Sequence, residues 1–512
     1  MSTPDNSLAE FRALVADRLG LWFEEHRWDF LTGVLRERST AHGRDLLSYL
    51  QGLASPGSRD EWQTLACLLT INETYFMRGG DHLGAFVSTV LPARLSAPPA
   101  GRPLRFLSAG CSSGEEAYSL AIALREHQLV PAHRSVQIIG VDINRAVLAK
   151  ARSGRYSAWS LRETPPEIRA KYFHADKSDF VLDDSILGMV TFFERNLSEP
   201  NDDLWQPGSF DAVFCRNMLM YLVPEVAADI VARIQRALAP GGFLFLGHAE
   251  TLRGISQGFH LRRNHGAFYY QLRGEDEAAP AAFPFEERRS EPIAPAPVLP
   301  TPEGGPAAST AWMEEIDRAS QRIARLSTQT GPSAPVTAPA ARSNPGAHFD
   351  RALDLHRQER FTEALAHLAE QPAGSAPDAE LLVLQAMLLV NSGRLDEAEA
   401  LCRPLLSTDD LNAGVRYVIA LCREHAGDLA NALEHDEAAA YLDPSFAMPR
   451  FHLGLVCKRL GRVLDARGHF EAALALLVKE DPVRLLLFGG GFSRETLVQA
   501  CRGELHQLHS AA

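Results

Sequence analysis

Two glutamates directly follow a short glycine-rich turn near residue 110, and acidic groups in that place favour a cationic ligand. Residues 103–124 predict a buried strand, a turn from Gly110 to Gly114 and an amphipathic helix. The turn has the spacing Gly-x-x-x-Gly and lacks the third glycine of a dinucleotide pyrophosphate site. Glu115 and Glu116 would repel a diphosphate but suit a ligand that presents an ammonium or a sulfonium. S-adenosylmethionine is such a ligand.

Further polar residues follow two other predicted strands. Asp142 ends the apolar run that starts at Val136, and its two carboxylate oxygens could accept both ribose hydroxyls of an adenosine. An aspartate that only begins a turn or caps the next helix is the alternative, and the preceding glycine-rich turn favours the nucleoside. Arg216 and Asn217 could be ordinary surface residues, but they follow another apolar strand, where substrate groups converge in open α/β sheets.

The elements that must position these residues divide the chain into several predicted parts. Residues 1–95 show helical periodicity and predict a small helical domain. Residues 96–273 alternate short apolar runs with helix-like stretches, which predicts an α/β domain with a mainly parallel sheet. Residues 274–345 hold 12 of the 31 prolines and predict a linker. Within it, residues 311–326 could form a docking helix or only a transient one.

The last third of the chain repeats with a period of 34 residues. A glycine frees the turn between paired helices, and a small alanine lets the two helices approach closely. Residues 346–480 therefore predict an all-α helix-turn-helix array that resembles the tetratricopeptide repeat, and residues 481–512 predict a helical tail. Such arrays usually present a groove to a protein partner or mediate self-association. The repeated positions are Gly393, Gly427 and Gly461, and Ala364, Ala398, Ala432 and Ala466.

The bulk composition excludes several classes of function. A net charge of -13 gives no electrostatic footprint for nucleic acid or an anionic membrane. The start of the chain lacks a secretory signal, and no apolar run is long enough to span a bilayer, so we expect a cytoplasmic protein. Its seven scattered cysteines predict reduced thiols, with no bound metal and no disulfide framework.

Five motifs follow one another in a fixed order: NETYFMR (72–78), AGCSSGEEAYS (109–119), GVDIN (140–144), ERNL (194–197) and CRNMLMY (215–221). In this order they resemble the chemotaxis receptor glutamate methyltransferases of the CheR family. The resemblance covers roughly residues 5 to 273. It implies a Rossmann-like class I methyltransferase domain with a small β-subdomain at about 155–192, the cofactor S-adenosylmethionine, and acceptor glutamates on the cytoplasmic helices of methyl-accepting receptors.

The same resemblance implies roles for individual residues. Arg78 would lie near the methyl-transfer centre, Glu115 would meet the amino group of the cofactor, and Asp142 its ribose. It leaves open whether Arg78 holds the carboxylate of the substrate or of the cofactor. Arg78 and Tyr221 are the implied catalytic residues. The implied cofactor-binding residues are Asn72, Thr74, Arg78, Ala109, Glu115, Asp142, Asn196, Leu197, Arg216 and Asn217.

A glutamate acceptor simplifies the expected chemistry. Its carboxylate is ionised at neutral pH, so it needs no general base, and catalysis should come from positioning the reactants in a dry site. Two other functions compete: a methyltransferase for another acceptor, and a scaffold whose methyltransferase half only senses the cofactor. The N-terminal helices add Arg27, Arg36, Arg38 and Arg44, which could face an acidic receptor helix or simply face water.

Overall fold

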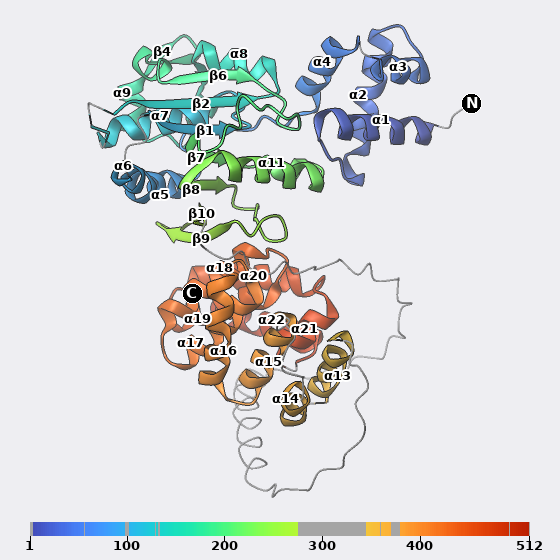
Figure 1. Ribbon diagram of the computed structural model, residues 1–512, viewed down its shortest axis with the longest axis vertical. Helices are drawn as coiled ribbons and strands as arrows, with labels where there is room; N and C mark the ends of the chain where they lie inside the picture. Colours follow the sequence, from blue (N-terminus) through green and yellow to red (C-terminus); the bar gives the residue numbers. More distant parts are fainter. Residues whose placement is uncertain are drawn as a thin grey trace, which may run out of the picture. The chain divides into compact units, whose positions relative to one another are not determined.

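The computed structural model describes residues 4–274 and 345–510, apart from gaps at 56, 98–101, 129, 132–133, 359, 370–378 and 491. The chain forms two compact units, Met1–Ala279 and Pro280–Ala512 (Figure 1). Nearly all of the predicted linker, including the possible helix at 311–326, lies outside the described residues. Among the described helices, none combines the length and the apolar character needed to cross a membrane.

A bundle of short helices begins the first unit. Its core contains Phe11, Leu35, Leu50 and Leu65, all nearly inaccessible to solvent. The amphipathic pattern of the first 70 residues therefore buries one common apolar core. The elements are α1 (Pro4–Leu19), η1 (Glu25–Arg27), α2 (Trp28–Ala41), α3 (Leu46–Leu53) and α4 (Arg59–Leu69).

Arg38 on α2 belongs to a polar network inside this bundle. Its guanidinium lies 2.7 Å from the Glu61 carboxylate, which also accepts a hydrogen bond of 2.7 Å from the Tyr49 hydroxyl. These contacts occupy Arg38 internally, so it is not free to meet an acidic partner. Arg36, which faces solvent on the same helix, remains available for that role.

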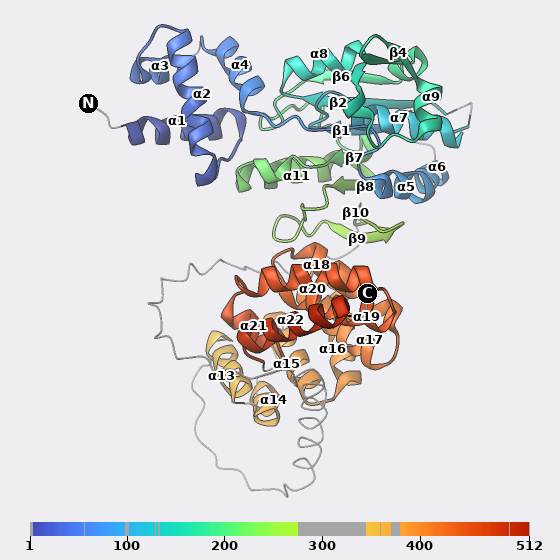
Figure 2. The same cartoon turned by 180° about the vertical axis from the view of Figure 1, so that it is seen from behind.

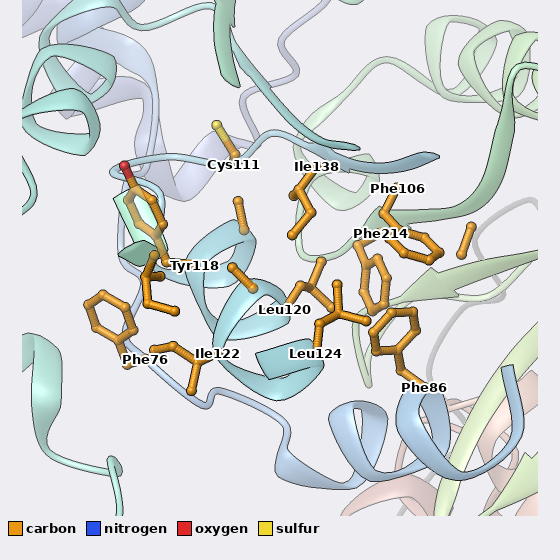
Figure 3. Packing of buried hydrophobic residues seen from close by; sticks show 14 of the residues in the cluster. Phe76, Phe86, Phe106, Cys111, Tyr118, Leu120, Ile122, Leu124, Ile138 and Phe214 are labelled. Carbon is orange, nitrogen blue, oxygen red and sulfur yellow. The ribbon is translucent and has the colours of Figure 1, made fainter. Parts of the chain in front are cut away.

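The helices that follow residue 76 pack on the sheet rather than on the N-terminal bundle. Phe86 makes edge-to-face contacts with Phe106 at 5.0 Å and Phe214 at 5.5 Å between ring centroids (Figure 3). Periodicity showed that this segment is helical, but it could not show which core its apolar face joins. These helices are α5 (Gly80–Ala85), the π-helical turn η2 (Phe86–Val90) and α6 (Leu91–Ser96).

Seven described strands form one sheet in the order β6-β2-β1-β7-β8-β10-β9. The first five are parallel, and the β9-β10 hairpin is antiparallel at one edge (Figures 1 and 2). The predicted Rossmann-like sheet is confirmed, and the carboxyl ends of its parallel strands share one edge. The strands are β1 (Leu104–Ala109), β2 (Val136–Asp142), β6 (Val190–Glu194), β7 (Phe210–Cys215), β8 (Leu238–Leu246), β9 (Phe259–Asn264) and β10 (Ala267–Leu272).

Helices connect the parallel strands, and a small second sheet lies between β2 and β6 in the chain. The main connecting helices are α7 (Glu115–His127), α8 (Arg145–Ser153) and α11 (Pro224–Ala237). The second sheet is antiparallel with the order β3-β5-β4. It falls inside the stretch where the β-subdomain was expected. Its elements are β3 (Arg155–Ser157), η3 (Ala158–Leu161), α9 (Pro166–Tyr172), β4 (Phe173–Asp176), β5 (Asp179–Leu182) and α10 (Asp184–Leu187).

The second unit is an array of antiparallel helix pairs, as a tetratricopeptide-like module requires. The turn glycines Gly393, Gly427 and Gly461 all adopt positive φ angles of 73° to 79°, which glycine tolerates best. The four repeated alanines are completely buried. The helices are α13 (Pro345–Arg357), α14 (Phe361–Ala369), α15 (Ala379–Asn391), α16 (Leu395–Thr408), α17 (Ala413–His425), α18 (Leu429–Leu442), α19 (Ala447–Arg459), α20 (Val463–Leu477), α21 (Pro482–Phe488) and α22 (Arg494–Ser510).

A buried histidine ties three of these helices together. The ring of His452 on α19 contacts Asp436 on α18 and lies 2.9 Å from Glu424 on α17. Burial alone would lower the pKa of His452, but these two carboxylates outweigh it and raise that pKa from 6.5 to about 10. A raised pKa means that the charged pairing stabilises the fold fully below pH 6.5 and is lost as the pH rises through about 10.

We therefore expect the stability of the repeat unit to fall by about 2 kcal/mol between neutral and strongly alkaline pH, the usual value of a charged buried hydrogen bond. Urea unfolding of the His452→Gln variant, followed across that range, should lack this loss. The matched control is His425→Gln, which removes an exposed histidine from α17. An equal pH dependence in all three proteins would contradict the prediction.

Candidate functional site

The glycine-rich turn after β1 brings the start of α7 close to the neighbouring elements. Gly110 and Gly114 have φ angles of 71° and 90°. A Cβ atom at Gly114 would stand 2.9 Å from side-chain atoms of both Ala151 and Phe192, so any larger residue would push α7 outward. The turn thus leaves backbone N–H groups and small side chains at the carboxyl edge of the sheet.

Asp142, the last residue of β2, is fixed against this turn. One carboxylate oxygen accepts the Ser112 N–H at 2.8 Å, and the other accepts the Asn144 N–H at 2.8 Å. The side chain is only 8% exposed. Burial raises the pKa of Asp142, while these backbone donors act against the rise. A carboxylate has about four acceptor sites, so Asp142 keeps acceptor capacity for a diol ligand beside these backbone bonds.

A cleft of about 860 Å³ opens beside Asp142, between the N-terminal bundle and the edge of the sheet. Its walls include Trp22, Phe23 and Ile143 together with the backbone turn at Gly110. The predicted site residues that line this larger cavity are Asn72, Asp142, Asn196, Leu197, Asn217 and Tyr221.

A second cavity of about 430 Å³ adjoins the first, because Gly110, Ser112 and Asn217 line both. Charged side chains line this smaller cavity, among them Arg78, Glu116 and Arg216. Glu116 accepts a hydrogen bond of 2.7 Å from the Ser108 hydroxyl and lies 3.1 Å from the Arg216 guanidinium, which is only 6% exposed. The predicted site residues that line this smaller cavity are Thr74, Arg78, Arg216 and Asn217.

Two predicted cofactor residues line neither cavity. Ala109 is buried at the end of β1, and Glu115 is completely buried behind the turn. The Glu115 carboxylate accepts a hydrogen bond of 2.7 Å from the Ser113 hydroxyl and lies 3.7 Å from the Lys150 ammonium. Of the two adjacent glutamates, the structure brings Glu116 to the cavity. The motif pointed to both, but the first turn of a helix directs neighbouring side chains to different sides.

The side-chain amide of Asn196 forms hydrogen bonds at the junction between the N-terminal bundle and the sheet domain. It donates a hydrogen bond of 2.8 Å to the Arg18 carbonyl oxygen at the end of α1, and its oxygen accepts the Ser198 N–H. A backbone bridge crosses the same junction: Trp22 N–H donates to Tyr221 O at 2.8 Å. These contacts hold the N-terminal bundle against the cavity wall.

Glu250 is a site residue that the motifs did not reveal. Its buried carboxylate accepts the Asn217 N–H at 2.6 Å and the Gly247 N–H at 2.7 Å. It thereby holds Asn217 at a φ of 57°, in the left-handed region that asparagine tolerates. The available signal was an acidic residue four positions after the end of strand β8, since the motifs AGCSSGEEAYS and GVDIN also place acidic residues at or after a strand end.

Comparisons with known proteins decide the family. The family model "CheR methyltransferase, SAM binding domain" matches residues 72–266. Chemotaxis protein methyltransferase 2 of Vibrio cholerae is 35% identical over 263 residues, which cover 51% of this chain and 90% of the relative. Chemotaxis protein methyltransferase of Salmonella typhimurium is 32% identical, over 49% of this chain and 85% of the relative.

The chain belongs to the CheR methyltransferase family. It is therefore an S-adenosylmethionine-dependent protein-glutamate methyltransferase, as its motifs predicted. A further CheR relative, the probable biofilm formation methyltransferase WspC of Pseudomonas putida, is 29% identical over 466 residues. That similarity covers 90% of this chain and 97% of the relative, so it extends beyond the CheR domain into the repeat unit.

The cavities suit the cofactor of the CheR family. The larger cavity pairs the Asp142 carboxylate, an acceptor for ribose hydroxyls, with apolar walls such as Leu197 that fit a purine ring. The smaller cavity, which shares lining residues with the larger one, contains the Glu116 carboxylate, an acceptor for an ammonium group. Both sets of residues fit S-adenosylmethionine by charge and by polarity.

Proposed function

We propose that the chain methylates glutamate side chains on the cytoplasmic helices of methyl-accepting receptors, and that its two cavities divide the work. The observation that carries this proposal is their junction at Gly110. There the apolar cavity that contains Asp142 adjoins the charged cavity that contains Arg78, Glu116 and Arg216. S-adenosylmethionine supplies a methyl group activated on a sulfonium.

The residues of the larger cavity hold the nucleoside in this proposal. Asp142 accepts the ribose hydroxyls, and Leu197 and Ile143 pack against the base. Glu116, rather than Glu115, receives the amino group of the cofactor, because Glu116 lines the smaller cavity. Asn72 holds the wall in shape: its carbonyl oxygen accepts a hydrogen bond of 3.1 Å from the Ser112 hydroxyl.

Arg78 orients the acceptor carboxylate. Arg216 is buried and already paired with Glu116, whereas Arg78 lies half-buried at the rim and donates one hydrogen bond of 2.9 Å to the Glu73 carbonyl oxygen. A guanidinium at the rim can form paired hydrogen bonds with a carboxylate that arrives from solvent. Asn217 lines both cavities and Tyr221 lines the larger one, and the two side chains shape the path of the methyl group.

Two surfaces could bind other proteins: the exposed face of α2 could bind the receptor substrate, and the repeat unit could bind a protein partner. Arg36 on α2 faces solvent and can meet an acidic receptor helix, whereas Arg38 is held by Glu61. The repeat unit recruits a protein partner, as helical-repeat arrays do through their concave surfaces. The enzyme acts in the cytoplasm, where the receptor helices present their glutamates.

The test is transfer of a tritiated methyl group from the cofactor to cytoplasmic fragments of the host's own receptors. We expect label that alkali releases, because glutamyl methyl esters hydrolyse in base, and we expect no label on fragments whose acceptor glutamates are replaced by alanine. Alkali-stable label would point to another acceptor. Cofactor binding without any transfer would favour the scaffold function instead.

A further inference from the structure

A cluster of metal-binding side chains lies outside both cavities. Asp81 and His82 come from α5, and His248 comes from the loop after β8. Each offers one ligand atom, and these atoms lie within 4.8 Å of one another. We propose that Asp81, His82 and His248 bind a divalent transition-metal ion. This assignment goes beyond methyl transfer and does not depend on it.

The tautomer of His82 prepares it as a ligand. Its Nε2 lies 3.1 Å from the Phe268 carbonyl oxygen, which can only accept, so Nε2 must carry the hydrogen. The other nitrogen, Nδ1, is then a bare lone pair, and it is buried without a hydrogen-bond partner in a side chain that is only 1% exposed. Histidines that bind metals commonly donate their second ring N–H to a backbone carbonyl in this way.

The charges around His82 are compatible with a bound cation. The Arg216 guanidinium lies close to His82, since both side chains pack against Gly79. Arg216 does not leave the region strongly positive, because Glu116 pairs with it at 3.1 Å. The carboxylate of Asp81 then adds a negative charge toward the proposed ion.

His248 can complete the site from the solvent side. Its ring stacks on His82 with centroids 4.8 Å apart, and its Nε2 lies 3.8 Å from the Asp81 carboxylate. The side chain is 63% exposed, so its ring can turn toward an ion with little repacking. Two imidazoles and one carboxylate select zinc, cobalt or nickel over magnesium or calcium, and solvent would supply the remaining ligands.

Such an ion would fasten α5 to the loop that carries Glu250. That loop holds the backbone of Asn217, which lines both cavities. Asp81, His82 and His248 themselves do not line either cavity. The proposed ion is therefore a structural clamp beside the methyltransferase site.

Cobalt(II) titration of the full chain, after treatment with a chelator, tests the site. We expect visible ligand-field bands without the near-ultraviolet charge transfer of cobalt-thiolate bonds, and displacement of cobalt by zinc. His248→Ala and Asp81→Asn should each weaken binding at least as much as the roughly ten- to hundredfold typical of losing an outer-shell partner. Circular dichroism would confirm that both variants remain folded.

His174→Ala is the matched control. It removes another exposed histidine that lies 3.3 Å from a carboxylate, that of Asp183, and it should leave cobalt affinity unchanged. Absence of cobalt binding, thiolate charge transfer, or equal affinity in all variants would overturn the proposal. Cofactor affinity measured on the same proteins should be unchanged, so failure of the metal site remains distinct from failure of the methyltransferase assignment.

Discussion

The Arg78→Ala variant should methylate receptor fragments about a hundred- to a thousandfold more slowly than the parent enzyme, a loss typical of removing one preorganised charge-stabilising donor. The guanidinium sits at the rim of the smaller cavity, where it can align the acceptor carboxylate. Its removal should therefore lower kcat, while the affinity for S-adenosylmethionine changes little. Steady-state kinetics and calorimetry with the cofactor measure the two quantities separately.

Arg162→Ala is the matched control for this experiment. Arg162 stacks on the Tyr75 ring at 3.7 Å, and Arg78 contacts the same ring at 5.6 Å, but Arg162 does not line either cavity. Arg78→Lys should recover only part of the rate, since an ammonium cannot form the paired hydrogen bonds of a guanidinium. Full turnover in Arg78→Ala would remove the residue from the mechanism. A large loss of cofactor affinity would assign Arg78 to the cofactor's carboxylate instead.

The Asp142→Asn variant should bind S-adenosylmethionine roughly ten- to a hundredfold more weakly, because hydrogen bonds to a charged group contribute about 1.5 to 3 kcal/mol. Both carboxylate oxygens accept backbone N–H groups, from Ser112 and Asn144. An asparagine amide would direct an N–H group at one of these donors, which also distorts the turn. Isothermal calorimetry with the cofactor or its demethylated product measures the loss.

Asp211→Asn supplies the comparison. This aspartate is also buried, and it pairs with Arg94 at 2.9 Å and Arg102 at 2.7 Å, but it lies at the beginning of β7, away from the carboxyl edge of the sheet. We expect Asp211→Asn to lower thermal stability and to preserve cofactor affinity. If both variants lost the same affinity, Asp142 would owe its effect to folding rather than to contact with the ribose.

Much of the fold was readable from the sequence because local patterns determine it. The 34-residue spacing of glycines and alanines predicted the repeats, since three turns have a glycine at positive φ and four repeated alanines are buried. The apolar runs before Gly110, Asp142 and Arg216 predicted three strands whose ends now share one edge. Both patterns, the spacing of small residues and the apolar runs, could be read from the sequence because each depends on residues that lie close together in the chain.

The parts that could not be predicted depend on contacts between distant residues. The choice between Glu115 and Glu116 rests on Lys150 and Arg216, which lie far along the chain. The pairing of Arg38 with Glu61 joins two helices whose packing no periodicity describes. Similarly, Glu250 acts on the backbone 33 residues earlier. A single sequence shows the charge of such residues but not their partners.

The hydrogen bond from the Trp22 N–H to the Tyr221 carbonyl oxygen belongs to an antiparallel backbone bridge between Leu21 and Leu222. This bridge limits which segments of related enzymes can be combined in a hybrid. One strand of this bridge comes from the N-terminal bundle, and the other follows directly on Tyr221. A hybrid enzyme that takes its first 70 residues from one parent and the sheet from another would pair two backbone segments that evolved in different proteins. A hybrid should therefore fold and bind the cofactor only when the segments around Leu21 and Leu222 come from the same parent enzyme.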